Sequence, residues 1–258
     1  MSSTSVKPQL VSSVVPLIDA KGSHVMVAIA KATWHIAGAD LVPAGDALPI
    51  EYVDTHVEGD PARELLLPAD LTDFKPAAEV LIIRPGMPVE QASFAGRTVA
   101  VQIGSLAFSA PAQDPWPFGP VARSHPSRLQ YAGTYDEYWQ QERMPLLPED
   151  FDPRFNQCAP RQQLLDGYLV GDELVTVDGL YAGAASFRLP ELTVLVSGNV
   201  RQRYFSEIAT LDTVLIWSEA PAITLVWRHV IRPARKTAEV GAVTVGLIRL
   251  RTARDLYG

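Results

Sequence analysis

Short apolar stretches recur at even spacing through the second half of the chain, and turn-forming residues separate them. The clearest is 223–231, where Ile223, Leu225 and Trp227 alternate with residues of the opposite face. An alternation with period two is typical of an extended strand whose two faces meet different surroundings. Many such stretches separated by turns predict a mainly β fold, with antiparallel sheets in a β-sandwich or barrel-like arrangement.

The same alternation predicts further strands along the sequence. They fall at 11–36, 79–83, 97–108, 174–177, 186–189, 192–196, 211–217 and 240–251. Asp178-Gly179 is a strong hairpin signal after one strand, and Ser197-Gly198-Asn199 predicts a turn after another. In the 97–108 stretch, Val99, Val101 and Ile103 share one face, which indicates a sheet with its other side in water.

Proline interrupts this pattern in two long segments. The chain has 21 prolines among 258 residues, above the usual frequency of about 5%. Because proline has no amide donor, it collects in turns and loops, so residues 43–78 and 109–130 are predicted to be long proline-rich loops.

The expected domain organisation has three parts. We predict a flexible N-terminus at 1–10, a β domain at 11–231 and a C-terminal strand extension at 232–258. The size is near the upper limit for one hydrophobic core, so two lobes at about 11–110 and 165–258 are an alternative to a single domain.

One short helix is predicted near 135–143. Thr134 and Glu137 have the spacing of a capping box, in which each side chain bonds the other residue's amide, and Pro145 ends the helix. An aromatic stripe at helical spacing follows, made of Tyr135, Tyr138 and Trp139. Such a stripe packs a helix onto a sheet or offers anchors to a partner, and both interpretations are open.

The charge and the cysteine count restrict the partners and the compartment. A net charge of −7 and a pI near 5.2 argue against binding to nucleic acid or to an anionic membrane. A single cysteine, Cys158, fits a reducing compartment, and Met1 to Leu10 lack the pattern of a signal peptide. No apolar segment reaches the ~20 residues that span a bilayer. The expected location is the cytoplasm.

Motifs for chemistry are mostly missing. The sequence has no phosphate loop, dinucleotide fingerprint or nucleophile elbow, so no cofactor is expected. His24 and His35 could meet across a hairpin, but strand-surface histidines are the simpler interpretation, and Cys158 is interpreted as a small buried apolar residue. The acidic run Glu149, Asp150 and Asp152 could hold a metal or divide acid and base roles, yet aspartates between prolines also form turns.

Four motifs occur in order along the chain, at Phe74–Leu81, Phe118–Val121, Gly133–Trp139 and Pro148–Asn156. Taken together, they resemble motifs of the bacterial domain of unknown function 2169 family. The resemblance extends over roughly residues 10–231 and is dense between 116 and 228. The residues predicted for partner binding or for the family motifs are Lys75, Pro76, Phe118, Gly119, Pro120, Gly133, Thr134, Tyr135, Asp136, Trp139, Pro148, Asp150, Phe151 and Asp152. The chain departs from the family pattern in a shorter 109–120 stretch, and in Arg84 where a glycine is expected.

The resemblance implies a cytoplasmic adaptor or chaperone of the type VI secretion system, without catalytic residues, cofactor or metal. Such a protein binds a secreted toxin effector and aids its loading onto the spike or tip protein of the contractile injection machine. Two alternatives are a hydrolase or metal-binding enzyme that uses Glu149, Asp150 and Asp152, and a structural subunit of a phage-tail-like particle. The effector, the binding face and the oligomeric state do not follow from the sequence.

Overall fold

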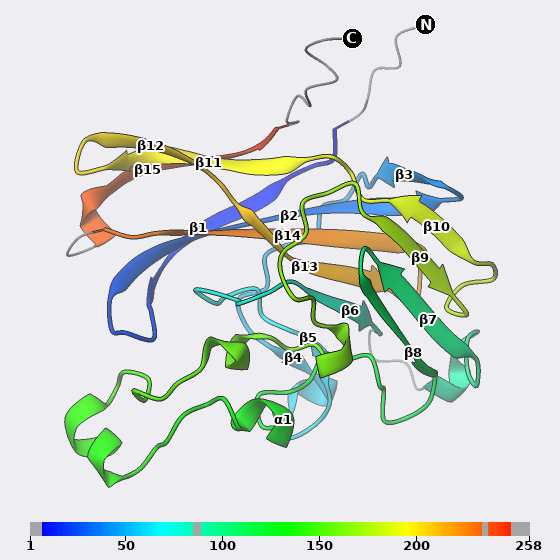
Figure 1. The fold of residues 1–258 in the computed structure, drawn as a ribbon, viewed down its shortest axis with the longest axis horizontal. Helices are drawn as coiled ribbons and strands as arrows, with labels where there is room; N and C mark the ends of the chain where they lie inside the picture. The colour runs from blue at the N-terminus through cyan, green and yellow to red at the C-terminus, as the bar shows by residue number, and fades with distance from the viewer. Residues whose placement is uncertain (1–6, 85–88, 234–236, 249–258) are drawn as a thin grey trace, which may run out of the picture.

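The computed structural model describes residues 7–84, 89–233 and 237–248. Its largest sheet has the order β1-β2-β14-β13-β6, with β3 added beside β2 (Figure 1). These strands are β1 (Val11–Ile18), β2 (His24–Ala37), β3 (Asp40–Pro43), β6 (Glu79–Ile83), β13 (Thr210–Trp217) and β14 (Ala222–Ile231). Neighbouring strands are antiparallel, except that β6 runs parallel to β13.

Two smaller antiparallel sheets lie against the large one. The first has the order β10-β9-β7-β8 and the second has the order β12-β11-β15. Their strands are β7 (Thr98–Ile103), β8 (Leu106–Pro111), β9 (Leu174–Asp178), β10 (Ala185–Arg188), β11 (Thr193–Val200), β12 (Arg203–Ile208) and β15 (Val240–Ile248). A short ribbon pairs β4 (Thr55–His56) with β5 (Leu65–Leu67).

Among the described residues, helical structure is confined to short turns in the loops. One is an α-helical turn, α1 (Pro126–Leu129). The others are η1 (Val57–Gly59), η2 (Val89–Gln91), η3 (Trp139–Arg143), η4 (Pro153–Asn156), η5 (Arg161–Gln163) and η6 (Thr237–Glu239). The frame of the molecule is therefore made of sheets alone.

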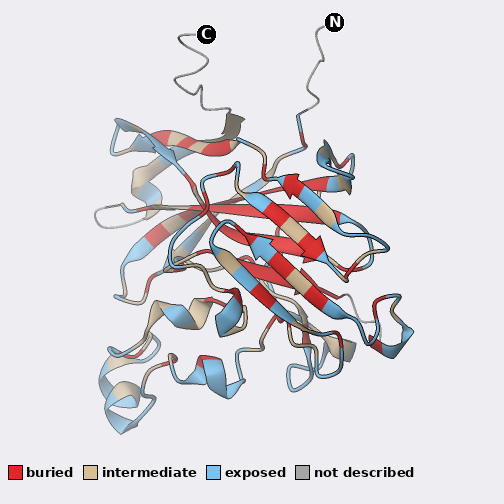
Figure 2. Cartoon of the chain, turned by 45° about the vertical axis from the view of Figure 1, so that its right-hand side comes forward, coloured by how far each residue is buried: buried red, intermediate tan, exposed pale blue. Residues whose placement is uncertain are grey.

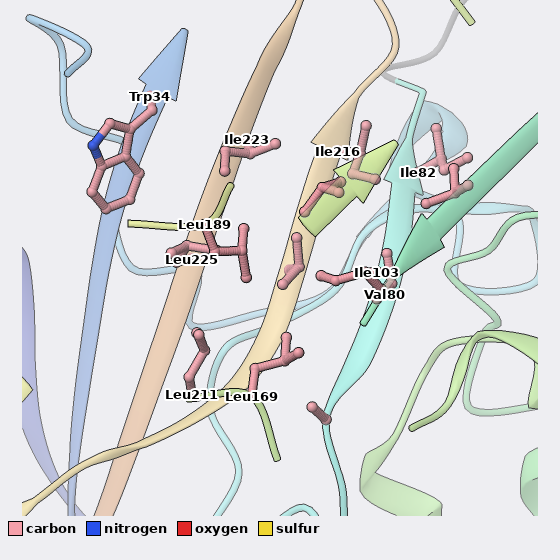
Figure 3. Packing of buried hydrophobic residues seen from close by; sticks show 14 of the residues in the cluster. Trp34, Val80, Ile82, Ile103, Leu169, Leu189, Leu211, Ile216, Ile223 and Leu225 are labelled. Carbon is pink, nitrogen blue, oxygen red and sulfur yellow. The ribbon is translucent and has the colours of Figure 1, made fainter. Parts of the chain in front are cut away.

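The main core is the apolar layer between the large sheet and the two smaller ones. Figure 3 shows Ile223 and Leu225 of β14 and Ile82 of β6 in this layer, together with Ile103 of β7. Alternation decides which side chains enter it, since Val99, Val101 and Ile103 are buried while Ala100 and Gln102 between them are partly or fully exposed. Figure 2 shows buried and exposed residues alternating along the strands of the smaller sheets.

Loops cover the other face of the large sheet, so its central strands are buried on both sides. Val27 and Val226 pack there against Ile50, and Leu81 packs against Cys158. Polar residues on this face are paired, as in the buried Lys31 and Asp70, whose charged groups lie 2.5 Å apart. Strands covered on both faces are nearly continuous apolar runs, as β14 is.

The predicted mainly β fold of antiparallel sheets is confirmed, and none of the sheets in the described residues closes into a barrel. The two ranges considered as lobes, 11–110 and 165–258, both give strands to the large sheet and to the β10-β9-β7-β8 sheet. Within 232–258, Val240–Ile248 form β15 beside β11, whereas 249–251 of the predicted last strand lie outside the described residues.

One predicted turn is wrong. Ser197-Gly198-Asn199 lies inside β11, which carries a register shift between Gly198 and Val200. The chain reverses instead at Arg201 and Gln202, whose φ values are +48° and +65°. Neither residue is a usual left-handed turn former, so the hairpin gave no signal in the sequence, and the strand β12 after it was not predicted.

Among the described residues, no helix is long and apolar enough to cross a membrane.

Candidate partner-binding surface

Two of the motif residues predicted for partner binding, Lys75 and Pro76, lie at a buried polar network. Glu79, at the start of β6, has no exposed side-chain surface, and its Oε1 lies 2.5 Å from the Lys75 ammonium. Its Oε2 accepts hydrogen bonds from the backbone amides of Cys158 and Ala159, at 2.7 and 2.8 Å. One carboxylate therefore joins the large sheet to the loop before β9.

The network continues through a bulge in β13, where the register with β14 shifts between Leu211 and Thr213. Lys75 donates to the Thr213 hydroxyl at 2.8 Å, and that hydroxyl donates to Asp212. Arg228 of β14 donates to the other Asp212 oxygen at 3.0 Å. A bulge can direct two successive side chains to one side of a sheet, and here both complete a buried network.

Burial and neighbouring charges shift the pKa values of Glu79 and Lys75 in opposite directions. Burial alone would raise the pKa of Glu79, but the Lys75 ammonium and the hydrogen bonds to the carboxylate lower it below its usual value. Burial would likewise lower the pKa of Lys75, but the charges of Glu79 and Asp212 raise it. Lys75 is thus held protonated and cannot serve as a base, so its role here is structural.

Phe118, Gly119 and Pro120 form an anchor in the main core. The Phe118 ring is fully buried and lies 5.0 Å from Trp116 and 6.1 Å from Phe108, between ring centroids. The Phe118 carbonyl accepts a hydrogen bond from the buried Gln163 side chain at 3.0 Å.

Gly119 has φ of +70°, and a Cβ on it would lie 2.8 Å from Pro160 Cδ. The motif is therefore also structural. Trp116 and Phe118 together fix the long proline-rich loop to the core.

Beyond this anchor, residues 131–152 project from the sandwich as a long loop, here called the arm (Figure 1). The amide of Asp152 donates to the Tyr131 carbonyl at 3.0 Å and closes the arm at its base. Just outside the base, Arg128 is almost fully buried and donates to the carbonyls of Val121 and Phe155. These contacts tie both ends of the arm to the body.

The neck of the arm brings together motif residues that are distant in sequence. Asp150 accepts hydrogen bonds from the Thr134 amide at 2.9 Å and from its hydroxyl at 2.7 Å. Those two bonds lower the pKa of the Asp150 carboxyl. Gly133 has φ of +82°, and a Cβ there would lie 2.8 Å from Pro148 and 2.9 Å from Asp150. The two limbs of the neck are therefore in contact.

We expect Gly133→Ala to loosen the neck, because alanine is strained at this φ and its methyl group would push the limbs apart. The strain costs about 1–3 kcal/mol. The readout is hydrogen exchange at the amides of Thr134 and Asp152, which should become about tenfold faster or more. Gly183→Ala, where no atom lies within 4 Å of the added methyl group, is the control. Unchanged exchange at the neck would contradict the role given to Gly133.

The predicted helix is present only as a short turn, and its predicted cap is wrong. Thr134 bonds Asp150, and the Asp136 carboxylate accepts from the Trp139 amide at 2.8 Å at the start of the turn. The turn then runs as the irregular η3 (Trp139–Arg143). The prediction from the capping-box spacing is wrong because the Thr134 hydroxyl bonds Asp150, which lies 16 residues away in the sequence.

The aromatic stripe does not pack onto a sheet. Tyr135 contacts Trp139 edge to face at 4.7 Å, and Trp139 donates to the Leu146 carbonyl at 2.7 Å. The outer side chains stay in solvent, with exposed fractions of 49% for Tyr135, 57% for Tyr138 and 64% for Met144. These three residues are called the aromatic tip. Met144 did not stand out in the sequence, because only the turn of the arm returns it to Trp139, whose carbonyl accepts from the Met144 amide at 2.9 Å.

Phe151 and Asp152 belong to the root of the arm. The Phe151 ring meets Phe155 at 5.8 Å between centroids. Asp152 accepts from the Arg154 amide and guanidinium, and the bond to the guanidinium lowers the pKa of its carboxyl. The Arg154 guanidinium also lies over the Tyr131 ring at 4.3 Å. Both motif residues therefore shape the loop that carries the tip.

The acidic run does not form a joint site. Asp150 bonds Thr134, Asp152 bonds Arg154, and the mostly exposed Glu149 lies 3.8 Å from Arg143. Within the described ranges, no group of three or more His, Cys, Asp or Glu side chains is placed to hold a metal ion.

Neither the histidine pair nor the cysteine forms a reactive site. The idea that His24 and His35 meet across a hairpin is wrong, because both lie on the single strand β2. Cys158 is buried as predicted, and burial raises the pKa of its thiol, so the thiol stays protonated.

The fold and the arm together define a mainly β scaffold that displays a projecting, internally bonded loop. Residues 107–228 match the model of a family described as "Uncharacterized protein conserved in bacteria (DUF2169)". This segment holds the anchor and the whole arm, and over it the resemblance predicted from the sequence is confirmed. A search of curated proteins and a search of solved structures each gave no match.

Proposed function

We propose that this protein is a non-enzymatic adaptor or chaperone that works in the cytoplasm. It would bind a secreted toxin effector and aid its loading onto the spike or tip protein of a type VI secretion machine. The observation that carries the proposal is the aromatic tip, Tyr135, Tyr138 and Met144, held in solvent on a fixed arm. The role in secretion rests on what the family resemblance implies, and the exposed tip supports the proposal that the arm contacts the partner.

The chemistry of the tip suits a protein partner. Tyrosine and methionine are enriched at protein interfaces, and tyrosine gives a large contact area with few rotatable bonds. Most of the tip area is in water, so burying it against an apolar partner surface would stabilise the complex. Exposed acidic residues lie next to the tip residues in the sequence, among them Asp136, Glu137 and Glu142, and they favour a partner with basic groups at its rim.

The construction of the arm supports the same proposal. Flexible loops lose conformational entropy when they bind, which weakens affinity. Here the Thr134–Asp150 bonds, the Asp152–Tyr131 bond and the Arg128 contacts fix the arm before a partner arrives. A tip held in this way retains more of its contact energy as affinity.

The test is affinity capture of the tagged protein from its source bacterium, followed by mass spectrometry. We expect the wild-type chain to recover a secreted toxin together with a spike or tip protein. Replacing Tyr135, Tyr138 and Met144 by alanine should weaken that complex at least about tenfold, because exposed tyrosines at an interface often contribute more than about 1 kcal/mol each. Since the tip packs on no sheet, the variant should unfold like wild type.

A matched control removes apolar area elsewhere. Tyr52, Val53 and Val170 are also exposed, and their triple alanine variant should capture the same proteins as wild type. Recovery of no effector and no spike component by the wild-type protein would refute the adaptor proposal. Equal capture by both triple variants would refute the role of the tip while leaving an adaptor role to another surface.

A further inference from the structure

The strand β12 (Arg203–Ile208) is an open edge on the far side of the molecule from the arm. It ends the β12-β11-β15 sheet, and within the described residues it pairs with β11 alone (Figure 1). Two of its apolar side chains are exposed, Tyr204 at 70% and Ile208 at 52%. An edge of this kind presents backbone donors and acceptors that another strand can pair with.

The charges on β12 are arranged symmetrically. Arg203 and Glu207 lie two residues before and two residues after Phe205, on the same face of the strand. Both are exposed, and neither forms an ion pair within the part of the chain that the structure describes. In an antiparallel pair centred on Phe205, Arg203 of one copy would face Glu207 of the other, and the reverse pair would form by symmetry.

We propose that β12 pairs with β12 of a second copy, antiparallel and centred on Phe205, so that two three-stranded sheets become one six-stranded sheet across a two-fold axis. The symmetric charges favour a second copy of this chain as the partner strand. When β12 pairs with itself in the antiparallel direction, Arg203 always meets Glu207, whereas the sequence of an unrelated strand is not bound to place opposite charges at these positions. Charges on an edge strand usually repel other strands, but opposite charges at mirrored positions attract a copy of the same strand.

The other outer strands lack this arrangement. β1 has no charged residue and carries Pro16, and β8 and β15 have no charged residue either. β10 carries one charge, Arg188, which already pairs with Asp172. Among the described edge strands, β12 alone carries two opposite charges at equal distances from a central residue, so that they would face each other when two copies pair in the antiparallel direction.

The expected dimer is weak. Six paired residues per copy bury less than the roughly 800 Å² per partner of a standard interface. Dissociation should therefore occur in the micromolar range or above, and the dimer should form only as concentration rises. This inference does not depend on the adaptor proposal, since its surface and its readout are separate from the arm.

The test is sedimentation equilibrium of the full chain from about 1 µM to about 1 mM, which spans weak and moderate affinities. Wild-type protein should shift from monomer to dimer. Arg203→Glu and Glu207→Arg each place two like-charge contacts in the dimer, and each should weaken self-association by about tenfold or more. An equimolar mixture of the two variants should associate at least as well as wild type, because only the mixed dimer restores both opposite-charge contacts.

Glu219→Arg, at the exposed turn between β13 and β14, makes the same charge change away from the edge and should leave the dimer unchanged. Circular dichroism of all variants checks that the fold is retained. Wild-type protein that stays monomeric throughout, or a dimer indifferent to both edge variants, would overturn the proposal. A mixture no more associated than its components would overturn the antiparallel register.

Discussion

Glu79→Gln is expected to lower the free energy of unfolding by about 3–5 kcal/mol, because it leaves the Lys75 charge buried without its counter-ion. The glutamine amide has nearly the same shape, and its oxygen can still accept from the amides of Cys158 and Ala159, so the change is mainly one of charge. Urea denaturation followed by tryptophan fluorescence gives the measurement.

Two variants show whether buried charge is the cause. Glu58→Gln removes a carboxylate from the exposed pair with Arg63, and it should change stability by less than about 1 kcal/mol. Lys75→Met combined with Glu79→Gln removes both charges and should recover part of the loss. A loss below about 1 kcal/mol for Glu79→Gln alone would mean that water or local rearrangement compensates Lys75 and that the network is not a structural requirement.

The same pair predicts a dependence on pH. The folded-state pKa of Glu79 is lower than its unfolded value, so its contribution is present above the unfolded pKa and is lost as pH falls through the folded pKa. The folded-state pKa of Lys75 is raised, so its contribution is present below the unfolded pKa near 10.5 and is lost as pH rises through the folded pKa. The two contributions coexist between these limits, and Glu79→Gln should flatten the acid limb of the stability profile.

Local patterns in the sequence predicted most of the strands, because each strand's alternation reflects which face is buried. The predicted 97–108 strand is wrong in one respect, since it is a hairpin of two strands, β7 and β8. The 79–83 strand matches β6 in its bounds, and Val99, Val101 and Ile103 face the core as predicted. The pattern says nothing about which strands are neighbours, and the parallel pairing of β6 with β13 joins segments more than 100 residues apart. Nor does it show that Glu79, an acidic residue at a strand start, is buried completely.

The family motifs named the residues of the candidate surface, but the sequence did not show what each of them contacts. The family motifs named residues that the structure divides into a buried group, such as Lys75 and Phe118, and an arm group, such as Gly133 and Asp150. That division depends on contacts between distant segments. For example, the Thr134 hydroxyl donates a hydrogen bond to Asp150, although the local spacing had predicted that it caps a helix. The exposure of the aromatic tip also depends on the arm leaving the sheets, which no local pattern encodes.

Phe118→Ala is the second change for which we expect a large effect, a loss of about 3–5 kcal/mol in the free energy of unfolding. The ring is fully buried and meets both Trp116 and Phe108, so alanine would leave a cavity in the main core. Phe74→Ala, at a residue that is 40% exposed, should cost much less and serves as the control. Denaturant midpoints of the two variants decide the comparison.

The effect of Phe118→Ala on the arm also tests whether the buried motif residues and the aromatic tip have different roles. Because Phe118 anchors the segment that leads into the arm, its loss should speed hydrogen exchange at α1 and at the arm base as well as lower global stability. At a temperature where the variant is still folded, the aromatic tip is chemically intact, so partner capture should persist. Capture that fails in the folded Phe118→Ala protein but persists in the tip variant would reverse our assignment of anchor and contact surface.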